Sequence, residues 1–299
     1  MPTADSAAQA TALVLPGDAR RPVAWMSRIL RRHPTMIAGG ALLTAMVVAS
    51  LLAPYVFTTD PRELNPVDRL RAPTGAHWFG TDMYGRDVYS RTIYGARISL
   101  VVGFSVSILS TGIGLVIGLV SGYSRALDAV IMRIMDGLMS IPAILLAIAM
   151  MALMSASVQN VIIAITIPEI PRVVRLVRAL VLSLREQPFV EAASAMGAGF
   201  LRTMFRHIMP NTLAPLIVQG TYIMASAVII EAYLSFLGAG TPPDIPSWGN
   251  IMAEGRTYVQ IGFWIILFPG ICLALTVLGI NLMGDGLRDT LDPRIARRM

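Results

Sequence analysis

Long runs of apolar residues without charged side chains dominate the pattern along this chain. The first run, 34–59, contains 26 residues, and a helix of that length exceeds the roughly 30 Å of a bilayer's hydrocarbon core. Further runs follow at 98–124, at 137–168, at 208–230 (continuing past Glu231 to 237) and at 257–284. Each run is long enough to cross a membrane, so the pattern predicts membrane-spanning helices.

One of these runs, 137–168, is too long for a single span, and a polar patch at 155–160 interrupts it. We therefore predict two helices that meet at this patch, which gives six spans in an all-α integral membrane protein. Before the first span, apolar residues of 23–33 share one helical face, which indicates either an interfacial helix or an ordinary juxtamembrane turn. The predicted domains are a cytoplasmic tail with this interfacial helix at 1–33, a six-span membrane domain at 34–287 and a cytoplasmic tail at 288–299.

Composition agrees with this architecture. Hydrophobic residues make up 55% of the chain, charged residues only 14%, and the mean hydropathy is +0.65. Soluble domains usually carry about 25% charged residues, so this chain lacks the polar surface that a water-soluble protein of its size needs. The net charge of +6 does not indicate nucleic-acid binding, because the arginines flank the apolar runs and form no single basic face.

The same arginines predict the orientation of the spans. Cytoplasmic loops of membrane proteins are enriched in basic residues, and one of the two possible orientations puts 17 of the 24 arginines on the cytoplasmic side. In that orientation both termini are cytoplasmic, the loop 58–97 is outside and the segment 183–210 is inside. The protein is expected to reside in a cytoplasmic (inner) membrane and to cross it several times.

A glycine stripe marks the second span. Gly114, Gly118 and Gly122 recur every four residues, and small residues on one helical face allow two helices to approach closely in a membrane. The stripe therefore predicts close packing of this span against another helix, and a ligand-binding role for these glycines is not expected.

The cytoplasmic segment 183–210 has the strongest local signals. Residues 188–196 should form a short helix, because Pro188 suits a first-turn position and alanines follow it. Gly197 and Gly199 should end that helix, and a second helix should begin near Phe200. The segment is therefore expected to form a protruding knob: a short helix, a glycine elbow and a helix that returns to the membrane.

The residues Glu191, Ala192, Ala193, Gly197 and Pro210 resemble the EAA loop of ABC importer permeases. Three other segments resemble, in order, the second permease of dipeptide, oligopeptide and nickel importers. They are the outer-loop segment 80–100, the segment 234–249 and the C-terminal segment 284–294. One departure from that branch is the sequence EIP at 169–171.

This resemblance implies a type I ABC importer permease that forms half of a translocation path for di- or oligopeptides, with nickel complexes, glutathione or another peptide-like solute as alternatives. The knob would be the coupling helix that docks on an ATP-binding subunit. Implied partners are a homologous second permease, two ATP-binding subunits, an extracytoplasmic substrate-binding protein and the lipid bilayer. No cofactor is expected, because the partner subunits would bind ATP; this chain has no G-x-x-x-x-G-K-[ST] loop.

Two acidic residues lie within predicted spans and are candidates for the path or the outer gate. A buried carboxylate is costly unless it is paired, so Glu231 could hold a loop or helix or contact a peptide. Glu169 could likewise pair with Arg172 or Arg175. Outside the spans, a charged group and a tryptophan could contact the binding protein or could be paired within the loop itself; they are Asp82, Arg86, Asp87, Arg91 and Trp248.

Two other functional classes would leave different patterns in the sequence. An intramembrane enzyme would need ionisable or nucleophilic groups that converge at membrane depth, and only Glu169 and Glu231 qualify. A proton-coupled carrier would be indicated by inverted repeats or paired broken helices, which the sequence does not display. The three histidines are far apart in sequence and indicate no metal site. Since neither alternative class has support and the motifs resemble permeases, we expect a transport protein and not an enzyme.

Overall fold

The computed structural model of the protein describes residues 34–56 and 58–291. Apart from Pro34, these residues belong to one compact unit, Thr35–Met299. The predicted interfacial helix at 23–33, and the part of the C-terminal motif beyond Leu291, lie outside the described residues.

The regular structure in the described ranges is helical, apart from one isolated antiparallel bridge between Thr81 and Asp87. The all-α prediction is therefore confirmed for this part of the chain. The α-helices are α2 (Pro34–Leu51), α3 (Val88–Tyr123), α4 (Arg125–Met139), α5 (Ala143–Leu153), α6 (Val158–Arg185), α7 (Pro188–Ala195), α8 (Phe200–Thr203), α9 (Met209–Phe236), α10 (Trp248–Gly255) and α11 (Trp264–Leu291). Short 3-10 turns occur at Ala53–Tyr55, Pro66–Asp68 and Arg256–Tyr258, and a π-helical turn at Met204–Ile208.

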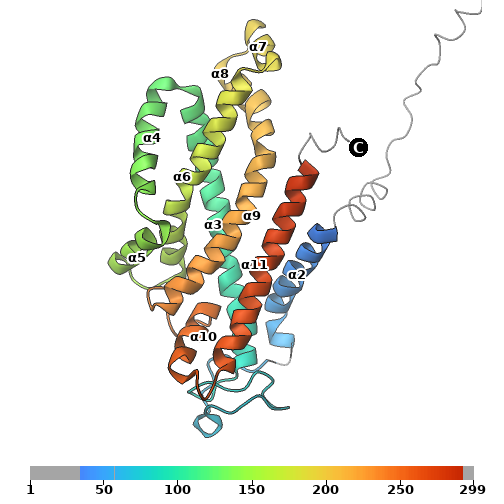
Figure 1. Ribbon diagram of the computed structural model, residues 1–299, viewed down its shortest axis with the longest axis vertical. Helices are drawn as coiled ribbons and strands as arrows, with labels where there is room; N and C mark the ends of the chain where they lie inside the picture. Colours follow the sequence, from blue (N-terminus) through green and yellow to red (C-terminus); the bar gives the residue numbers. More distant parts are fainter. Residues whose placement is uncertain (1–33, 57, 292–299) are drawn as a thin grey trace, which may run out of the picture. The chain divides into compact units, whose positions relative to one another are not determined.

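The long helices form a bundle (Figure 1) in which α3 packs against both α6 and α9. Helix α11 packs on α9, and α2 lies beside α11 on the side away from α4. The α2–α11 contact is close, because a Cβ atom added at Gly39 would lie 2.6 Å from the Gly279 carbonyl oxygen. Helices α7 and α8 are at one end of the bundle, and the loop 58–87 is at the other together with α10.

The glycine stripe makes the contact between α3 and α6. A Cβ atom added at Gly114, Gly118 or Gly122 would lie 2.5–2.6 Å from the Cβ atom of a valine on α6, and the valines involved are Val173, Val177 and Val181. These three valines are fully or almost fully buried. The prediction that the stripe serves close helix packing is confirmed.

Four helical segments are long and apolar enough to cross a membrane: α2, α3, the continuous segment Phe200–Phe236 and α11. A fifth span is possible if α4 and α5, which meet at an angle of 85°, are counted as one broken span. Helix α6 has 28 residues, about 42 Å at 1.5 Å per residue, but it carries several arginines. The sixth predicted span therefore depends on α6.

The structure corrects two predicted boundaries. Helix α3 begins at Val88 and not near Ile98, because Asp87 caps it by accepting a hydrogen bond of 2.7 Å from the Ser90 amide. The irregular part of the outer loop is therefore shorter than 58–97, and Arg91 lies on the first turn of a helix.

The second correction concerns the run 137–168. The predicted break at the polar patch is confirmed, since α5 ends at Leu153 and α6 begins at Val158. The third predicted span, however, begins at Arg125 as α4 and turns sharply before Ala143. Pro142 lies immediately before α5. It has no amide hydrogen and its ring would clash with the preceding turn, so α4 cannot continue through it.

Candidate functional site

The knob predicted from the sequence is present as α7, an elbow and α8. Helix α7 begins at Pro188, where a missing amide hydrogen costs nothing because first-turn amides have no partner within the helix. Its inner face buries Val190 and Ala193, while Glu191 and Ala192 are exposed. Two of the residues assigned to coupling thus lie on the outer surface of a short helix, and Ala193 helps to attach that helix to the rest of the chain.

Gly197 forms the elbow with a φ of +84°. The Ala198 amide donates to the Ala193 carbonyl at 3.0 Å, and the Gly197 amide donates to Ser194 at 3.0 Å. These two bonds are the Schellman pattern that ends many helices, and it favours glycine at the left-handed position. The prediction that Gly197 ends this helix is confirmed.

Pro210 lies at the start of α9, immediately after the π-helical turn Met204–Ile208. Because proline has no amide hydrogen, it cannot donate to the carbonyl four residues earlier. The Met209 amide instead reaches back to the Met204 carbonyl, and the Asn211 side chain donates to the His207 carbonyl at 2.6 Å. Pro210 therefore shapes the path by which the knob returns to the bundle.

The knob exposes an apolar surface together with the Glu191 carboxylate. Its large exposed apolar side chains are Phe189 (44%), Met196 (83%), Phe200 (44%) and Leu201 (63%), and Phe205 (54%) follows in the π-helical turn. Exposed apolar patches on a protein surface are typical of protein interaction sites. This surface is the strongest candidate for a contact with a partner protein at this end of the bundle.

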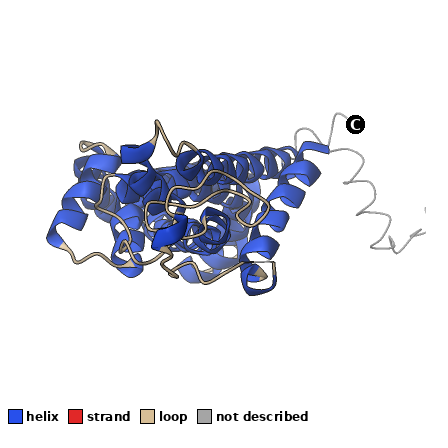
Figure 2. Cartoon of the chain, turned by 90° about the horizontal axis from the view of Figure 1, so that it is seen from below, coloured by secondary structure: helices blue, strands red, loops and turns tan. Residues whose placement is uncertain are grey.

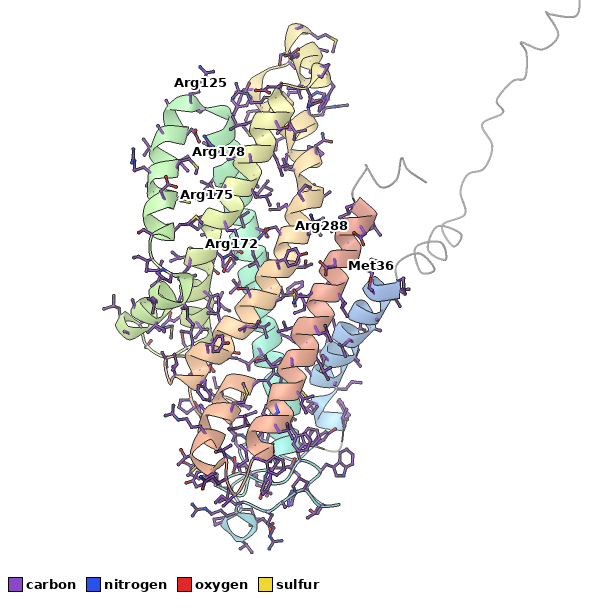
Figure 3. The ribbon with its side chains drawn as sticks, in the orientation of Figure 1. Met36, Arg125, Arg172, Arg175, Arg178 and Arg288 are labelled. Carbon is purple, nitrogen blue, oxygen red and sulfur yellow. The ribbon has the colours of Figure 1, made fainter. Side chains whose placement is uncertain are left out.

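Arginines on α6 connect this end of the bundle to α4 (Figure 3). Arg178 makes two hydrogen bonds to Asp128, at 2.5 and 2.6 Å, and Arg175 contacts Asp136 at 2.6 Å. Arg185, at the end of α6, donates to the last carbonyls of α3, those of Gly122 and Tyr123, at 3.1 Å each. A cation at a helix C-terminus is favourable, so these arginines fix the corner between α3, α4 and α6.

The two candidate acidic residues are both buried within the chain. Glu169 is 1% exposed and pairs with Arg172 at 3.0 Å, as one of the two sequence alternatives predicted. Glu231 is fully buried and accepts hydrogen bonds from Ser99 at 2.9 Å and from Ser235 at 2.8 Å. The bond from Ser99 joins α3 to α9, which supports the interpretation that Glu231 holds helices together. A role of either carboxylate in the path stays a prediction.

The charged residues of the outer loop form one network. Asp82 is fully buried and accepts from Arg86 at 2.7 Å and from Arg91 at 2.6 Å. Glu254 on α10 accepts from the same two arginines at 2.5 Å each. The network therefore connects the loop to α3 and α10, and such internal pairing is the alternative that the sequence left open.

The two other residues of this group are also engaged within the chain. Asp87 caps α3 and lies 3.1 Å from His77. Trp248 is fully buried, and its indole donates to the Thr92 carbonyl at 3.0 Å. The geometry favours a structural role for the group, and direct contact with a binding protein stays untested.

Sequence reasoning missed Asp128, Asp136 and Glu254 as partners of these arginines. The spacing of eight residues between Asp128 and Asp136 places both on one helical face and could have indicated a pairing surface. Glu254 is separated from Arg91 by 163 residues, so no local pattern could have found it. Among the described residues, no group of His, Cys, Asp or Glu could hold a metal ion.

The comparison with known families decides the class of the protein. A model of the family described as binding-protein-dependent transport system inner membrane component matches residues 111–297. The chain belongs to this family. It is therefore a membrane component of an ABC importer and not an enzyme, and the family match agrees with the apolar helices of the bundle.

Curated relatives cover nearly the whole chain. The probable peptide ABC transporter permease protein y4tQ of Sinorhizobium fredii is 50% identical over 271 residues, 91% of this chain and 93% of the relative. The di/tripeptide transport system permease protein DppC of Pseudomonas aeruginosa is 42% identical, over 88% of this chain and 89% of the relative. The resemblance to this branch of permeases is confirmed.

A solved structure shows the fold. The chain matches the inward-facing MetNI methionine ABC transporter with a TM-score of 0.55 and 24% identity, over 67% of this chain and 95% of that chain. The fold is that of a type I ABC importer permease.

Proposed function

We propose that this protein is the permease subunit that forms half of the translocation path of an ATP-driven peptide importer. The observation that carries the proposal is the knob: in a chain of this family, α7 and its glycine elbow present Glu191 and an apolar surface at one end of the bundle. The names of the relatives, which include peptide and di/tripeptide permeases, support a peptide as the substrate.

The partners in this proposal are a homologous second permease, two ATP-binding subunits and an extracytoplasmic substrate-binding protein. ATP would bring the two ATP-binding subunits together, and each would move the knob docked on it. Helix α6 leads into the knob, and Arg185 and the glycine contacts join α6 to α3. Such a movement would therefore be transmitted to the gate by packed helices.

We further propose that α6 is the sixth span. Its charged residues are paired: Glu169 with Arg172, Arg175 with Asp136 and Arg178 with Asp128. Ionisable residues at membrane depth face the bundle or a water-filled cavity and pair with one another, so these ion pairs are compatible with a membrane-spanning α6. Six spans put both termini on one side of the membrane. Because the arginines around the knob lie on that side, we place it in the cytoplasm.

Cysteine labelling tests this topology. In a Cys272→Ala background, Thr74→Cys in the outer loop should react with an impermeant thiol reagent added to intact cells, and Met196→Cys on the knob should not. Both side chains are exposed, so a difference would report their side of the membrane and not their burial. The reverse pattern would contradict the orientation; permeabilised cells, in which both should react, provide the control.

Transport measurements test the substrate. With the partner subunits in proteoliposomes and the binding protein outside, a labelled dipeptide or oligopeptide should accumulate only when ATP is present inside. Glutathione and a nickel complex should neither accumulate nor compete. ATP-dependent accumulation of one of these solutes without peptide uptake would replace the peptide proposal by the corresponding alternative. Accumulation without ATP would contradict the importer proposal itself.

A further inference from the structure

The outer loop covers the end of the bundle away from the knob (Figure 2), and its residues line a cavity. Its volume is about 240 Å³, and its lining is mostly apolar. It lies between the 3-10 turn Pro66–Asp68 and the turn that contains Tyr84. The lining residues are Leu64, Pro66, Arg69, Met83 and Tyr84.

One wall of the cavity is held in place by the buried charge network. Asp82 accepts a hydrogen bond of 2.8 Å from the Tyr84 amide, and the Tyr84 carbonyl accepts one of 3.1 Å from the Asn65 amide. The guanidinium of Arg86 lies over the Tyr84 ring, 4.6 Å from its centroid, a favourable cation–π distance. Tyr84 is therefore positioned before any partner arrives.

The turn at Tyr84 and the opposite wall fit together closely. Gly85 has a φ of +74°, and a Cβ atom there would collide with the Asn65 carbonyl oxygen. The close fit at Gly85 and the hydrogen bonds of Asp82 hold both walls of the cavity in place. The site is therefore preformed, and preorganised sites lose less entropy when a partner binds.

The surface around the cavity is mostly apolar and includes the guanidinium of Arg69. Leu64 is 63% exposed, Val67 79% and Tyr84 45%, although these residues lie in a loop outside the spans. Arg69 is exposed at the edge of the cavity and has no ion-pair partner among the residues that the structure describes. Tyrosine and arginine are enriched at the centres of protein interfaces.

We propose that this cavity, defined by Leu64, Pro66, Arg69, Met83 and Tyr84, is a docking pocket for the substrate-binding protein. An apolar side chain of the partner would enter the pocket, and a neighbouring carboxylate would pair with Arg69. The inference rests on the proposed function and on the orientation that places this loop outside. Asp82, Arg86 and Arg91 would hold the pocket in place without touching the partner. Leu64, Tyr84 and Arg69 would contact it directly.

Binding of the substrate-loaded binding protein to the reconstituted complex tests the pocket. Tyr84→Ala and Leu64→Ser should each raise the Kd about tenfold or more, as expected for residues at the centre of an interface. Arg69→Glu should weaken binding and slow association, and the salt dependence of association should decrease. Tyr84→Phe keeps the ring and should bind like the wild type.

Two exposed residues of the outer region that do not line the cavity are matched controls. Tyr55 is 82% exposed, and the exposed side chain of Arg62 lies 3.9 Å from Asp244. Tyr55→Ala and Arg62→Glu should leave the Kd unchanged within about twofold, since residues outside the centre of an interface contribute little.

Three outcomes would overturn the inference. The first is an unchanged Kd in all pocket variants, and the second is an equal loss in the control variants. The third is loss of the second permease during purification with normal binding of the binding protein, which would assign the pocket to a contact between permeases. Failure of the proposed function would differ, because the wild-type complex itself would then import no peptide.

Discussion

Replacing Gly197 by valine is expected to abolish coupled transport while the protein still inserts and folds. A β-branched residue at a φ of +84° costs about 1–2 kcal/mol or more, which reduces the population of this elbow conformation by a factor of about 5–30. A Cβ atom at Gly197 would meet no atom within 4 Å, so the strain is purely conformational. It should redirect α7 without disturbing the bundle. The measurement is reconstitution with the partner subunits, followed by assays of ATPase-subunit binding and peptide uptake.

Gly199 provides the matched control for this experiment. It lies two residues from the elbow and also has no atom within 4 Å of an added Cβ, but its φ is −66° and its ψ is 164°. Valine adopts this extended conformation readily. Gly199→Val should therefore transport normally. If both variants lose transport equally, added bulk on the knob and not the elbow is responsible; normal transport by Gly197→Val would remove the reason for assigning coupling to this segment.

The knob could be predicted because its signals are local. Proline at a helix start, alanines in the helix and glycine at its end each act over a few residues. The structure places α7 and the elbow where these signals indicate, at Pro188–Ala195 and Gly197. The glycine stripe of α3 is equally local, and its spacing alone predicts a close helix contact. It does not identify the partner helix, because Val173, Val177 and Val181 carry no matching signal.

The outer loop shows what such patterns cannot give. From the sequence, its charged residues could contact another protein or pair within the loop. In the structure Arg91 is buried and pairs with both Asp82 and Glu254. Whether an exposed-looking charge is paired depends on residues far away in the sequence. The exposed pocket beside this network consists of ordinary residues, such as Leu64 and Tyr84, whose sequence context gives no indication of a site.

The bend between α4 and α5 is an intermediate case. Pro142 predicts a kink, since proline clashes with the preceding helical turn. The angle of 85° between α4 and α5 is larger than an ordinary proline kink. It also depends on the position of α6, which packs against α4. Arg175 and Arg178 of α6 hold α4 through Asp136 and Asp128. The angle is therefore set by tertiary contacts that the position of the proline does not reveal.

Replacing Gly118 by leucine is expected to destabilise the bundle itself. A Cβ atom at this position would lie 2.6 Å from the Val177 Cβ and 3.1 Å from the Val174 carbonyl oxygen. Because one of these neighbours is backbone, α6 would have to move as a whole. Overpacking of a tight interior typically costs about 1–3 kcal/mol, and the affected contact is between the two helices that support the knob. The melting temperature of the isolated subunit in detergent should fall by several degrees, and its yield in the assembled complex should fall with it.

Gly112 is the control for this prediction, because it lies on the same helix and an added Cβ would meet no atom within 4 Å. Gly112→Leu places the same side chain on an exposed face of α3 and should melt like the wild type. Equal melting temperatures for Gly118→Leu and the wild type would mean that α3 and α6 can separate at no cost. The α3–α6 contact could then not transmit movement from the knob, and the rigid connection that the proposed mechanism needs would be absent. A lower melting temperature confined to Gly118→Leu would instead show that the glycine stripe holds α3 and α6 together, as the proposed transmission requires.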